Sequence, residues 1–92
     1  MKTLTNIHNN KATYNNGIVT FIKTSDKFYT YYNVYDVRFD FIIIGDTFDF
    51  NGTTYIKKSS RTAYVQNGGG KWFYFSNNDI CDVYLHEAKK DI

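Results

Sequence analysis

Apolar and charged positions alternate most regularly between Val34 and Phe41. One parity carries rings and a valine and the other is mostly charged: Tyr35, Val37, Phe39 and Phe41 against Val34, Asp36, Arg38 and Asp40. A period of two residues is typical of a β-strand with one buried face. We therefore predict a strand whose aromatic parity points inward and whose charged parity forms a ladder on the outer face. The apolar run 42–44 is expected to continue this strand through the core.

The N-terminal third predicts a loose arm followed by a hairpin and a tyrosine-rich strand. Residues 1–10 are polar and aperiodic, which favours the arm. The segment Asn15-Asn16-Gly17 then separates strands expected over 11–14 and 18–23, because an Asn-Gly pair supplies the positive φ angles of a tight turn. A polar turn at 24–27 leads into the strand expected over 28–35.

A second Asn-Gly pair, Asn51-Gly52, separates the segments 47–50 and 53–58 as a two-residue hairpin loop. A loop of this length fixes the register, so the facing residues can be named. The predicted pairs are Phe50 with Thr53, Phe48 with Tyr55 and Asp46 with Lys57. The three pairs lie on one face, and Phe48 with Tyr55 is expected to be the packing pair.

A third hairpin is expected to join 61–66 to 71–75 through the glycine-rich loop 67–70. Pairing Gln66 with Lys71 would place Trp72 and Tyr74 on the face of Ala63. The segment 80–85 that follows allows either a closing strand or a short C-terminal helical turn, and its β-branched and aromatic residues favour the strand. Residues 87–92 read as a charged tail.

Composition supports an all-β fold within a single domain, 1–92. The chain holds nine Tyr, eight Phe and one Trp but only two Leu and one Glu, and such residues suit a pleated sheet better than a helix. We expect a small, strongly curved antiparallel sheet or barrel of six to seven strands. From Gly45 to Leu85, the order of a tight hairpin, a longer glycine-rich hairpin and a last strand resembles the layout of an SH3-like barrel.

The single cysteine, Cys81, rules out an intramolecular disulfide, which favours a cytoplasmic location for so small a domain. The first ten residues contain no apolar run of the kind found in signal peptides. The longest uninterrupted apolar stretch, 41–44, is far shorter than a membrane-spanning helix requires. We therefore expect a protein that does not contact membranes.

Each candidate catalytic or cofactor motif lacks a residue or a spacing that its chemistry requires. On one strand face Asp36 and Asp40 would stand about 13 Å apart, too far for one metal ion. Cys81 lacks the short ligand spacings of zinc sites, and we expect it to be a small buried residue. The glycine-rich loop before Lys71 departs from the phosphate-binding pattern because Trp72 stands where Ser or Thr is needed. We predict no enzyme activity, no cofactor and no metal.

The net charge of +2 hides two stretches of opposite sign. Between Phe28 and Phe50 four Asp stand against one Arg, among four tyrosines. Tyrosines on a mixed-charge surface suit protein recognition, because each ring gives a large contact area at low entropic cost. The candidate protein-binding residues are Tyr29, Tyr31, Tyr32, Tyr35, Asp36 and Asp40.

Between Asp49 and Asp79 there is no acidic residue, and four cations lie among aromatic residues. Cations beside exposed rings are what single-stranded nucleic acid requires, for its phosphates and its bases. The residues of this alternative site are Lys57, Lys58, Arg61, Lys71 and Trp72.

These features favour a small non-enzymatic module that acts by direct protein–protein contact. Asn, Lys, Ile, Tyr and Phe, all encoded by AT-rich codons, make up about half of the chain. Small AT-rich proteins without catalytic motifs are common among phages and mobile elements, so the hypothesis is an inhibitor of host defence machinery, anti-CRISPR-like or of another anti-defence class. Its partner would be a host protein or nucleoprotein complex. A homodimer formed through a strand edge at 28–35 is a further expectation.

Overall fold

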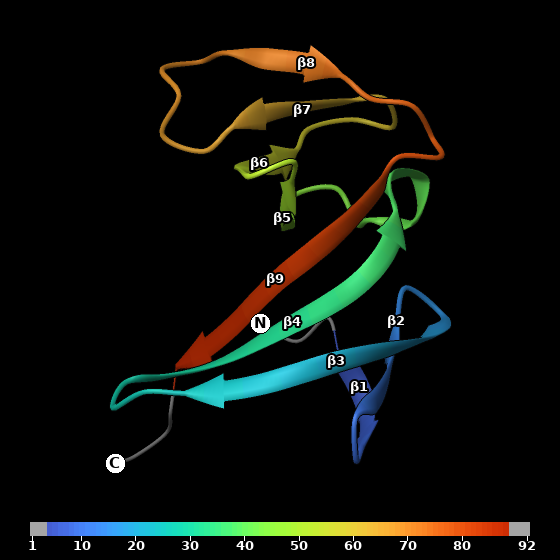
Figure 1. Cartoon of the computed structure of the whole chain (residues 1–92), viewed down its shortest axis with the longest axis vertical. Helices are drawn as coiled ribbons and strands as arrows, with labels where there is room; N and C mark the ends of the chain where they lie inside the picture. The colour runs from blue at the N-terminus through green and yellow to red at the C-terminus, as the bar shows by residue number, and fades with distance from the viewer. Residues whose placement is uncertain (1–3, 89–92) are drawn as a thin grey trace.

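The computed structural model describes residues 4–88 and shows one antiparallel sheet of nine strands, in the order β1-β2-β3-β4-β9-β5-β6-β7-β8 (Figure 1). The strands are β1 Leu4–His8, β2 Lys11–Tyr14, β3 Gly17–Ser25, β4 Tyr29–Arg38, β5 Thr47–Phe50, β6 Thr53–Lys57, β7 Thr62–Val65, β8 Trp72–Tyr74 and β9 Ile80–Ala88. A short 3-10 helix, η1 (Phe39–Phe41), follows β4, and these described residues contain no α-helix. The all-β prediction is confirmed.

A long ribbon of β4 and β9 forms the centre of the molecule. Strands β1 to β3 continue the sheet on the β4 side, and β5 to β8 continue it on the β9 side. Figure 1 shows these two groups at opposite ends of the molecule, with the ribbon running diagonally between them. The chain therefore builds two small β layers that share one central pair of strands.

The sheet is not closed into a barrel. Its first and last strands in the pairing order are β1 and β8, and they belong to opposite groups. The expected six to seven strands are too few, and the SH3-like layout is wrong because β9 pairs with β4 and β5 and leaves β8 at an edge. The curved, antiparallel character of the prediction remains.

The N-terminal residues are part of the sheet and not a loose arm. Leu4–His8 forms β1, which pairs with β2, and Leu4 is buried. Asn15 and Asn16 form the following turn with φ angles of 51° and 67°, the left-handed values of a type I′ hairpin. The first hairpin is confirmed, with a turn one residue shorter than predicted because Gly17 already belongs to β3. Residues 1–3 of the predicted arm lie outside the described residues.

The hairpin of β5 and β6 has the predicted register. Phe48 faces Tyr55 and Phe50 faces Thr53 across a loop of Asn51 and Gly52. The rings of Phe48 and Tyr55 stack with centroids 5.5 Å apart. Before the first pair, the Lys57 N–H donates to the Asp46 carbonyl at 3.0 Å, so these two residues also meet as predicted.

A β-bulge interrupts β4 at Asp36. This residue has a φ of 58°, and the register with β9 shifts by one residue between Val34 and Val37. The buried positions therefore change parity, from Tyr32 and Val34 before the bulge to Val37 and Phe39 after it. The prediction that Tyr35 points inward is wrong, because Tyr35 precedes the bulge and faces solvent.

The chain turns after Arg38, so the predicted strand does not continue. Phe39–Phe41 form η1, and the Ile42 N–H donates to the Phe39 carbonyl at 3.1 Å. Ile42 is buried, whereas Ile44 is exposed, so the run 42–44 is not a core strand. The charge ladder ends with Arg38, because Asp40 lies in the 3-10 turn.

The pairing of β7 with β8 differs from the predicted register by one residue. Tyr64 faces Trp72, Ala63 faces Phe73 and Thr62 faces Tyr74. Ala63 is fully buried, so its face belongs to the core. A shift of one residue exchanges the two faces of a strand, and it moves Trp72 and Tyr74 from that core face to the solvent face.

Residues 80–85 form a strand, as favoured, and β9 extends to Ala88. The Ser76 N–H donates to Asp79 Oδ2 at 2.9 Å, and the Asp79 N–H donates to the Ser76 carbonyl at 3.1 Å. This exchange closes a turn in place of a helix N-terminus. Glu87 and Ala88 belong to the sheet, and the rest of the predicted tail, 89–92, lies outside the described residues.

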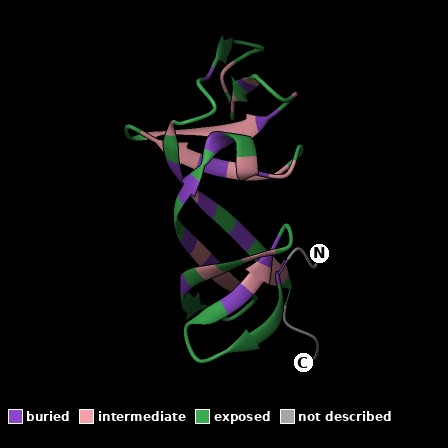
Figure 2. Ribbon diagram, turned by 90° about the vertical axis from the view of Figure 1, so that its right-hand side faces the viewer, coloured by how far each residue is buried: buried purple, intermediate pink, exposed green. Residues whose placement is uncertain are grey.

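The core is contiguous along the ribbon and is rich in rings. Figure 2 shows buried and exposed positions alternating along the long strands. Phe39 stacks on Phe75 with centroids 4.8 Å apart, and Phe48 meets both rings edge-on. Cys81 is buried, as predicted, within the same cluster. These contacts bind the ribbon to the β5–β8 group.

Gly17 in β3 lies against the Phe41 ring of η1, and Gly17→Ala is expected to lower the free energy of unfolding by about 1–3 kcal/mol. An added Cβ would lie 2.5 Å from Phe41 Cζ, and that ring packs edge-on against Tyr14. Urea unfolding measures the loss. The same substitution should cost less in a Phe41→Leu background; an equal cost in both backgrounds would show that the ring contact is not its origin.

The predicted dimer edge at 28–35 is not available. β4 lies between β3 and β9 and pairs with both, so its backbone groups are already used in the ladder. The sheet edges are β1 and β8. Any pairing between copies through a strand edge would have to use one of those two strands.

Candidate functional site

Four rings gather on the solvent face of the central ribbon. Tyr31 pairs with His86 across β4 and β9, and Tyr29 and Tyr84 lie on the same face. Tyr31 stacks on Tyr84 with centroids 5.6 Å apart and an interplanar angle of 21°, and Tyr29 meets His86 edge-on at 5.3 Å. We call these four residues the ribbon aromatic cluster.

The exposure of this cluster follows from strand parity. Tyr32, Val34, Val83 and Leu85 occupy the alternate positions of the same two strands and are buried in the core. The cluster must therefore point away from the core, and Tyr29 and Tyr84 remain 39% and 37% exposed. His86 is also exposed and Tyr31 is half-buried, so the rings are available for contact.

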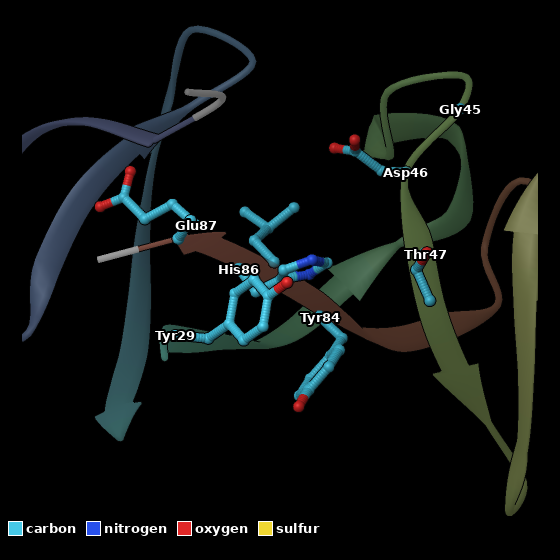
Figure 3. A pocket seen from close by; sticks show the side chains of 9 residues that line it. Tyr29, Gly45, Asp46, Thr47, Tyr84, His86 and Glu87 are labelled. Carbon is cyan, nitrogen blue, oxygen red and sulfur yellow. The ribbon is translucent and has the colours of Figure 1, made fainter. Parts of the chain in front are cut away.

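A hollow of about 420 Å³ lies beside the cluster, where the sheet forks (Figure 3). β5 pairs with β9 only from Asp82 to Tyr84, and beyond Tyr84 the two strands separate. Figure 3 shows Gly45, Asp46 and Thr47 on one side of the opening and Tyr29, His86 and Glu87 on the other. The residues lining the hollow are Tyr29, Gly45, Asp46, Thr47, Tyr84, Leu85, His86, Glu87 and Ala88.

The hollow is acidic. Asp46 is half-buried and accepts a hydrogen bond of 2.9 Å from the Tyr14 hydroxyl, and its burial raises the pKa of the carboxyl. Glu87 accepts a bond of 3.2 Å from the Tyr32 hydroxyl. Asp46 and Glu87 are the acidic residues of the lining, and no lysine or arginine is among the described residues that line the hollow. A cationic group is therefore the ligand that this lining favours.

Asp26 positions the two tyrosines at the start of the ribbon. One carboxylate oxygen accepts the backbone N–H groups of Phe28 and Tyr29 at 2.8 and 2.7 Å, which fixes the turn into β4. The other oxygen accepts the Tyr31 hydroxyl at 3.0 Å, and this hydrogen bond raises the pKa of the phenol. Tyr31 is thereby held neutral, with its ring against Tyr84.

The six predicted protein-binding residues do not form one patch. Tyr29 and Tyr31 belong to the ribbon aromatic cluster. Tyr32 is buried, so its assignment to a contact surface is wrong; it faces the core next to Phe21, with ring centroids 5.5 Å apart. Tyr35 and Asp36 lie at the bulge and Asp40 lies in η1, on a separate part of the surface.

Asp36 and Asp40 line a second hollow of about 360 Å³, where β3 separates from β4. The Arg38 guanidinium forms a bidentate contact with Asp40, at 3.1 and 2.7 Å, and this contact holds the pKa of the carboxyl below its usual range. The floor is apolar, with Ile18, Val19, Val37 and Phe41. Because Arg38 already neutralises Asp40, this hollow has less charge to offer a ligand than the first.

The sequence did not predict that Tyr84, His86 and Asp46 belong to one site. Each was visible in the sequence, and the alternation of Val83 and Leu85 with Tyr84 and His86 gives their parity once a strand is accepted. The signal that was lacking is the partner of that strand. Pairing of β9 with β4 joins positions about fifty residues apart and has no turn between them to fix it.

The predicted basic residues are also divided by the structure. Lys57 is only 4% exposed, so its assignment to a nucleic-acid surface is wrong. Its Nζ donates to the carbonyls of Phe39 and Ile42, both at 2.8 Å, and lies 4.4 Å from the centroid of the Phe39 ring. Lys58, Arg61, Lys71 and Trp72 are exposed on or beside the β7–β8 hairpin.

Cys81 is closed to solvent chemistry. Its side chain is buried in the core, and burial raises the pKa of the thiol to about 12. The thiol therefore stays protonated at neutral pH and is a poor nucleophile there. Within residues 4–88 no three His, Cys, Asp or Glu side chains lie close enough together to hold a metal ion.

Comparison with known proteins gives no guide to the site: no protein-family model, curated protein or solved structure matches the chain. Among the described residues there is also no helix long and apolar enough to cross a membrane. The geometry and charge of these surfaces are therefore the observations that indicate a function.

Proposed function

We propose that this protein is a small non-enzymatic binding module that binds a cationic segment of a partner protein. The observation that carries the proposal is the convergence of the ribbon aromatic cluster with the acidic hollow at the fork between β9 and β5. Rings and carboxylates line one hollow there, the rings from the solvent face of the ribbon and the carboxylates from its other face.

The chemistry of this opening suits lysine or arginine side chains. A guanidinium can stack on an exposed tyrosine ring while its N–H groups bond to a carboxylate, so Tyr84 and Tyr29 offer the faces, and Asp46 and Glu87 offer the charge. The rings are rigid and already packed against one another, so little side-chain entropy is lost on binding. Such a pocket favours a protein segment over a nucleic acid, whose phosphates the carboxylates would repel.

The finer proposal is that the partner is a host protein or nucleoprotein complex and that the module blocks it, as phage and mobile-element inhibitors of host defence do. A basic nucleic-acid groove on the partner would provide the cationic segment. The support for this class is the small size, the AT-rich coding and the acidic, tyrosine-bearing surface. A cytoplasmic location is part of the same proposal.

Tyr31→Ala and Tyr84→Ala are each expected to weaken capture of the partner from a bacterial host lysate by at least about 10-fold, because both rings contribute to one contact. The matched control is Tyr74→Ala, which removes an exposed ring at the far end of the sheet and should leave capture unchanged. Quantitative mass spectrometry of the captured proteins gives the ratio. Circular dichroism confirms that each variant is folded.

Asp46→Asn provides a charge test on the same site. Asparagine keeps an oxygen that can accept the Tyr14 hydroxyl but removes the negative charge. We expect weaker capture at low salt and a smaller loss at high salt, because screening already reduces the attraction. Capture that is indifferent to both tyrosines and to Asp46 would contradict the proposed site.

A further inference from the structure

An aromatic strip covers the solvent face of the β7–β8 hairpin. Tyr64 faces Trp72 directly, and Tyr74 lies beside Trp72 with its ring edge-on, the centroids 5.2 Å apart. These rings are 37%, 46% and 75% exposed, respectively. The opposite face of the hairpin carries the buried Ala63, so the core does not require the strip. A contiguous exposed patch of three rings is typical of a surface that binds a ligand or a partner.

Cations lie on and beside the hairpin that carries the strip. Lys58 Nζ lies 5.4 Å from the centroid of the Trp72 ring, and Lys71 is the neighbour of Trp72 in the chain. Arg61 is exposed, and its Nε donates to the Phe75 carbonyl at 3.2 Å, which fixes the guanidinium near the end of the hairpin. No acidic residue occurs between Asp49 and Asp79 to neutralise these charges.

The backbone of β8 adds polar groups to the same site. The Val65 N–H donates to the Lys71 carbonyl and the Phe75 N–H donates to the Arg61 carbonyl, both at 2.8 Å. Residues 71, 73 and 75 therefore direct their backbone groups toward β7, and Trp72 and Tyr74 direct theirs outward from the edge of the sheet. Donors and acceptors thus lie beside the two most exposed rings.

We propose that the β7–β8 strip is a binding site for single-stranded nucleic acid, separate from the protein-binding hollow. Bases stack on Trp72 and Tyr74, and phosphates contact Lys58, Arg61 and Lys71. Stacking on an aromatic platform tolerates any base, so the site reads the single strand and not its sequence. Figure 1 shows this hairpin at the opposite end of the molecule from the start of β4.

Charge favours this occupant over a second copy of the chain. Two copies meeting edge to edge at β8 would bring the same cations together, and this repulsion opposes the dimer. Duplex DNA is also disfavoured, because its bases are already stacked and cannot reach the rings. A strand with free bases and a negative backbone satisfies both the rings and the cations.

The test uses the single tryptophan, Trp72, as the probe. Titration with an oligothymidylate should quench its fluorescence as bases stack on the indole. With three phosphate contacts, the slope of log affinity against log salt should be about −2, and affinity should fall about 20-fold from about 50 to about 200 mM salt. A duplex of the same length should bind much more weakly.

Variants locate the contacts, with a labelled oligothymidylate and fluorescence anisotropy as the readout. Tyr74→Ala should weaken binding about 10-fold or more, and Lys71→Gln should weaken it and bring the salt slope about 0.7 closer to zero. Tyr84→Ala and Lys23→Gln are matched controls on other surfaces and should change neither value. Because the controls include a residue of the protein-binding site, failure of one proposal is distinguishable from failure of the other.

Three results would overturn the proposal. The first is the absence of quenching at low salt. The second is equal affinity for the single strand and the duplex, which would reveal attraction to phosphate alone. The third is light scattering that shows a dimer disrupted by Tyr74→Ala, because the strip would then be covered by a second copy.

Discussion

Lys57→Met is expected to lower the free energy of unfolding by about 3–4 kcal/mol. The ammonium group is the internal donor to the carbonyls of Phe39 and Ile42, and it lies over the Phe39 ring. Methionine retains the length and apolar stem of lysine but has no donor, so both bonds are lost without opening a cavity. The Ile42 carbonyl is left without this donor, which costs about 1–3 kcal/mol for a buried acceptor. The Phe39 carbonyl still accepts the Ile42 N–H but loses a bond to a charged donor, worth about 1.5–3 kcal/mol, and the two losses together give the expected value.

Urea unfolding of Lys57→Met beside Lys58→Met separates this effect from a general loss of charge. Lys58 is the next residue and is exposed, so its replacement should change stability by less than about 0.5 kcal/mol. Burial also lowers the pKa of Lys57, as expected for an ammonium taken out of water. Equal stability of the two variants would mean that Lys57 does not hold η1 against the sheet.

The second large effect is a steep loss of stability in alkali. Burial raises the pKa values of Tyr14 and of Cys81, the latter to about 12. Each group stays protonated in the folded chain at a pH where it ionises in the unfolded chain, so it favours folding at lower pH and this contribution is lost as pH rises. Above about pH 10.5 each group lowers the free energy of unfolding by about 1.4 kcal/mol per pH unit.

Tyr14 and Cys81 together contribute a slope of about −2.7 kcal/mol per pH unit between pH 10.5 and 12. The pKa values of Tyr31 and Tyr32 are also raised, so these groups act in the same direction. Lys57 acts in the opposite direction below its unfolded pKa of 10.5, because its folded pKa is lowered, and it contributes no slope above that value. Urea unfolding at several pH values measures the slope. Cys81→Ala and Tyr14→Phe should each make the slope shallower by about 1.4 kcal/mol per pH unit; an unchanged slope in both would assign the alkaline loss to other groups.

Turn chemistry explains which parts of the fold could be predicted from the sequence. Asn51-Gly52 adopts positive φ at both positions, so the loop has only two residues and every pair of β5 with β6 follows. At the longer glycine-rich loop, Val65 bonds to Lys71 across five residues, 66–70. Several loop lengths are compatible with such a sequence, and an error of one residue reversed the faces of Trp72 and Tyr74.

The bulge at Asp36 is the second feature that periodicity could not reveal. Alternation continues through it in the sequence, although the side-chain direction changes in the structure. Lys57 presents a similar limit: its pairing with Asp46 was predictable, but η1 folds over it and turns a surface position into a core one. Local pattern determines the pairing of neighbouring strands, and burial depends on segments that arrive from elsewhere in the chain.

The candidate sites show the same division. Tyr29 and Tyr31 were identified from local density, because they lie close together in the sequence. The hollow required the pairing of β4 with β9 and the divergence of β5 beyond Tyr84, both of which join distant segments. The sequence therefore predicted the tyrosines of the site. The acidic hollow, which favours a cationic ligand, is visible only in the structure.

Amide hydrogen exchange of the protein in complex with its purified partner tests the proposed function most directly. The account predicts slower exchange in Tyr29–Tyr31 and Tyr84–Ala88 on binding, with unchanged exchange across the β7–β8 hairpin. Protection confined to the β7–β8 hairpin, with the ribbon unaffected, would contradict it.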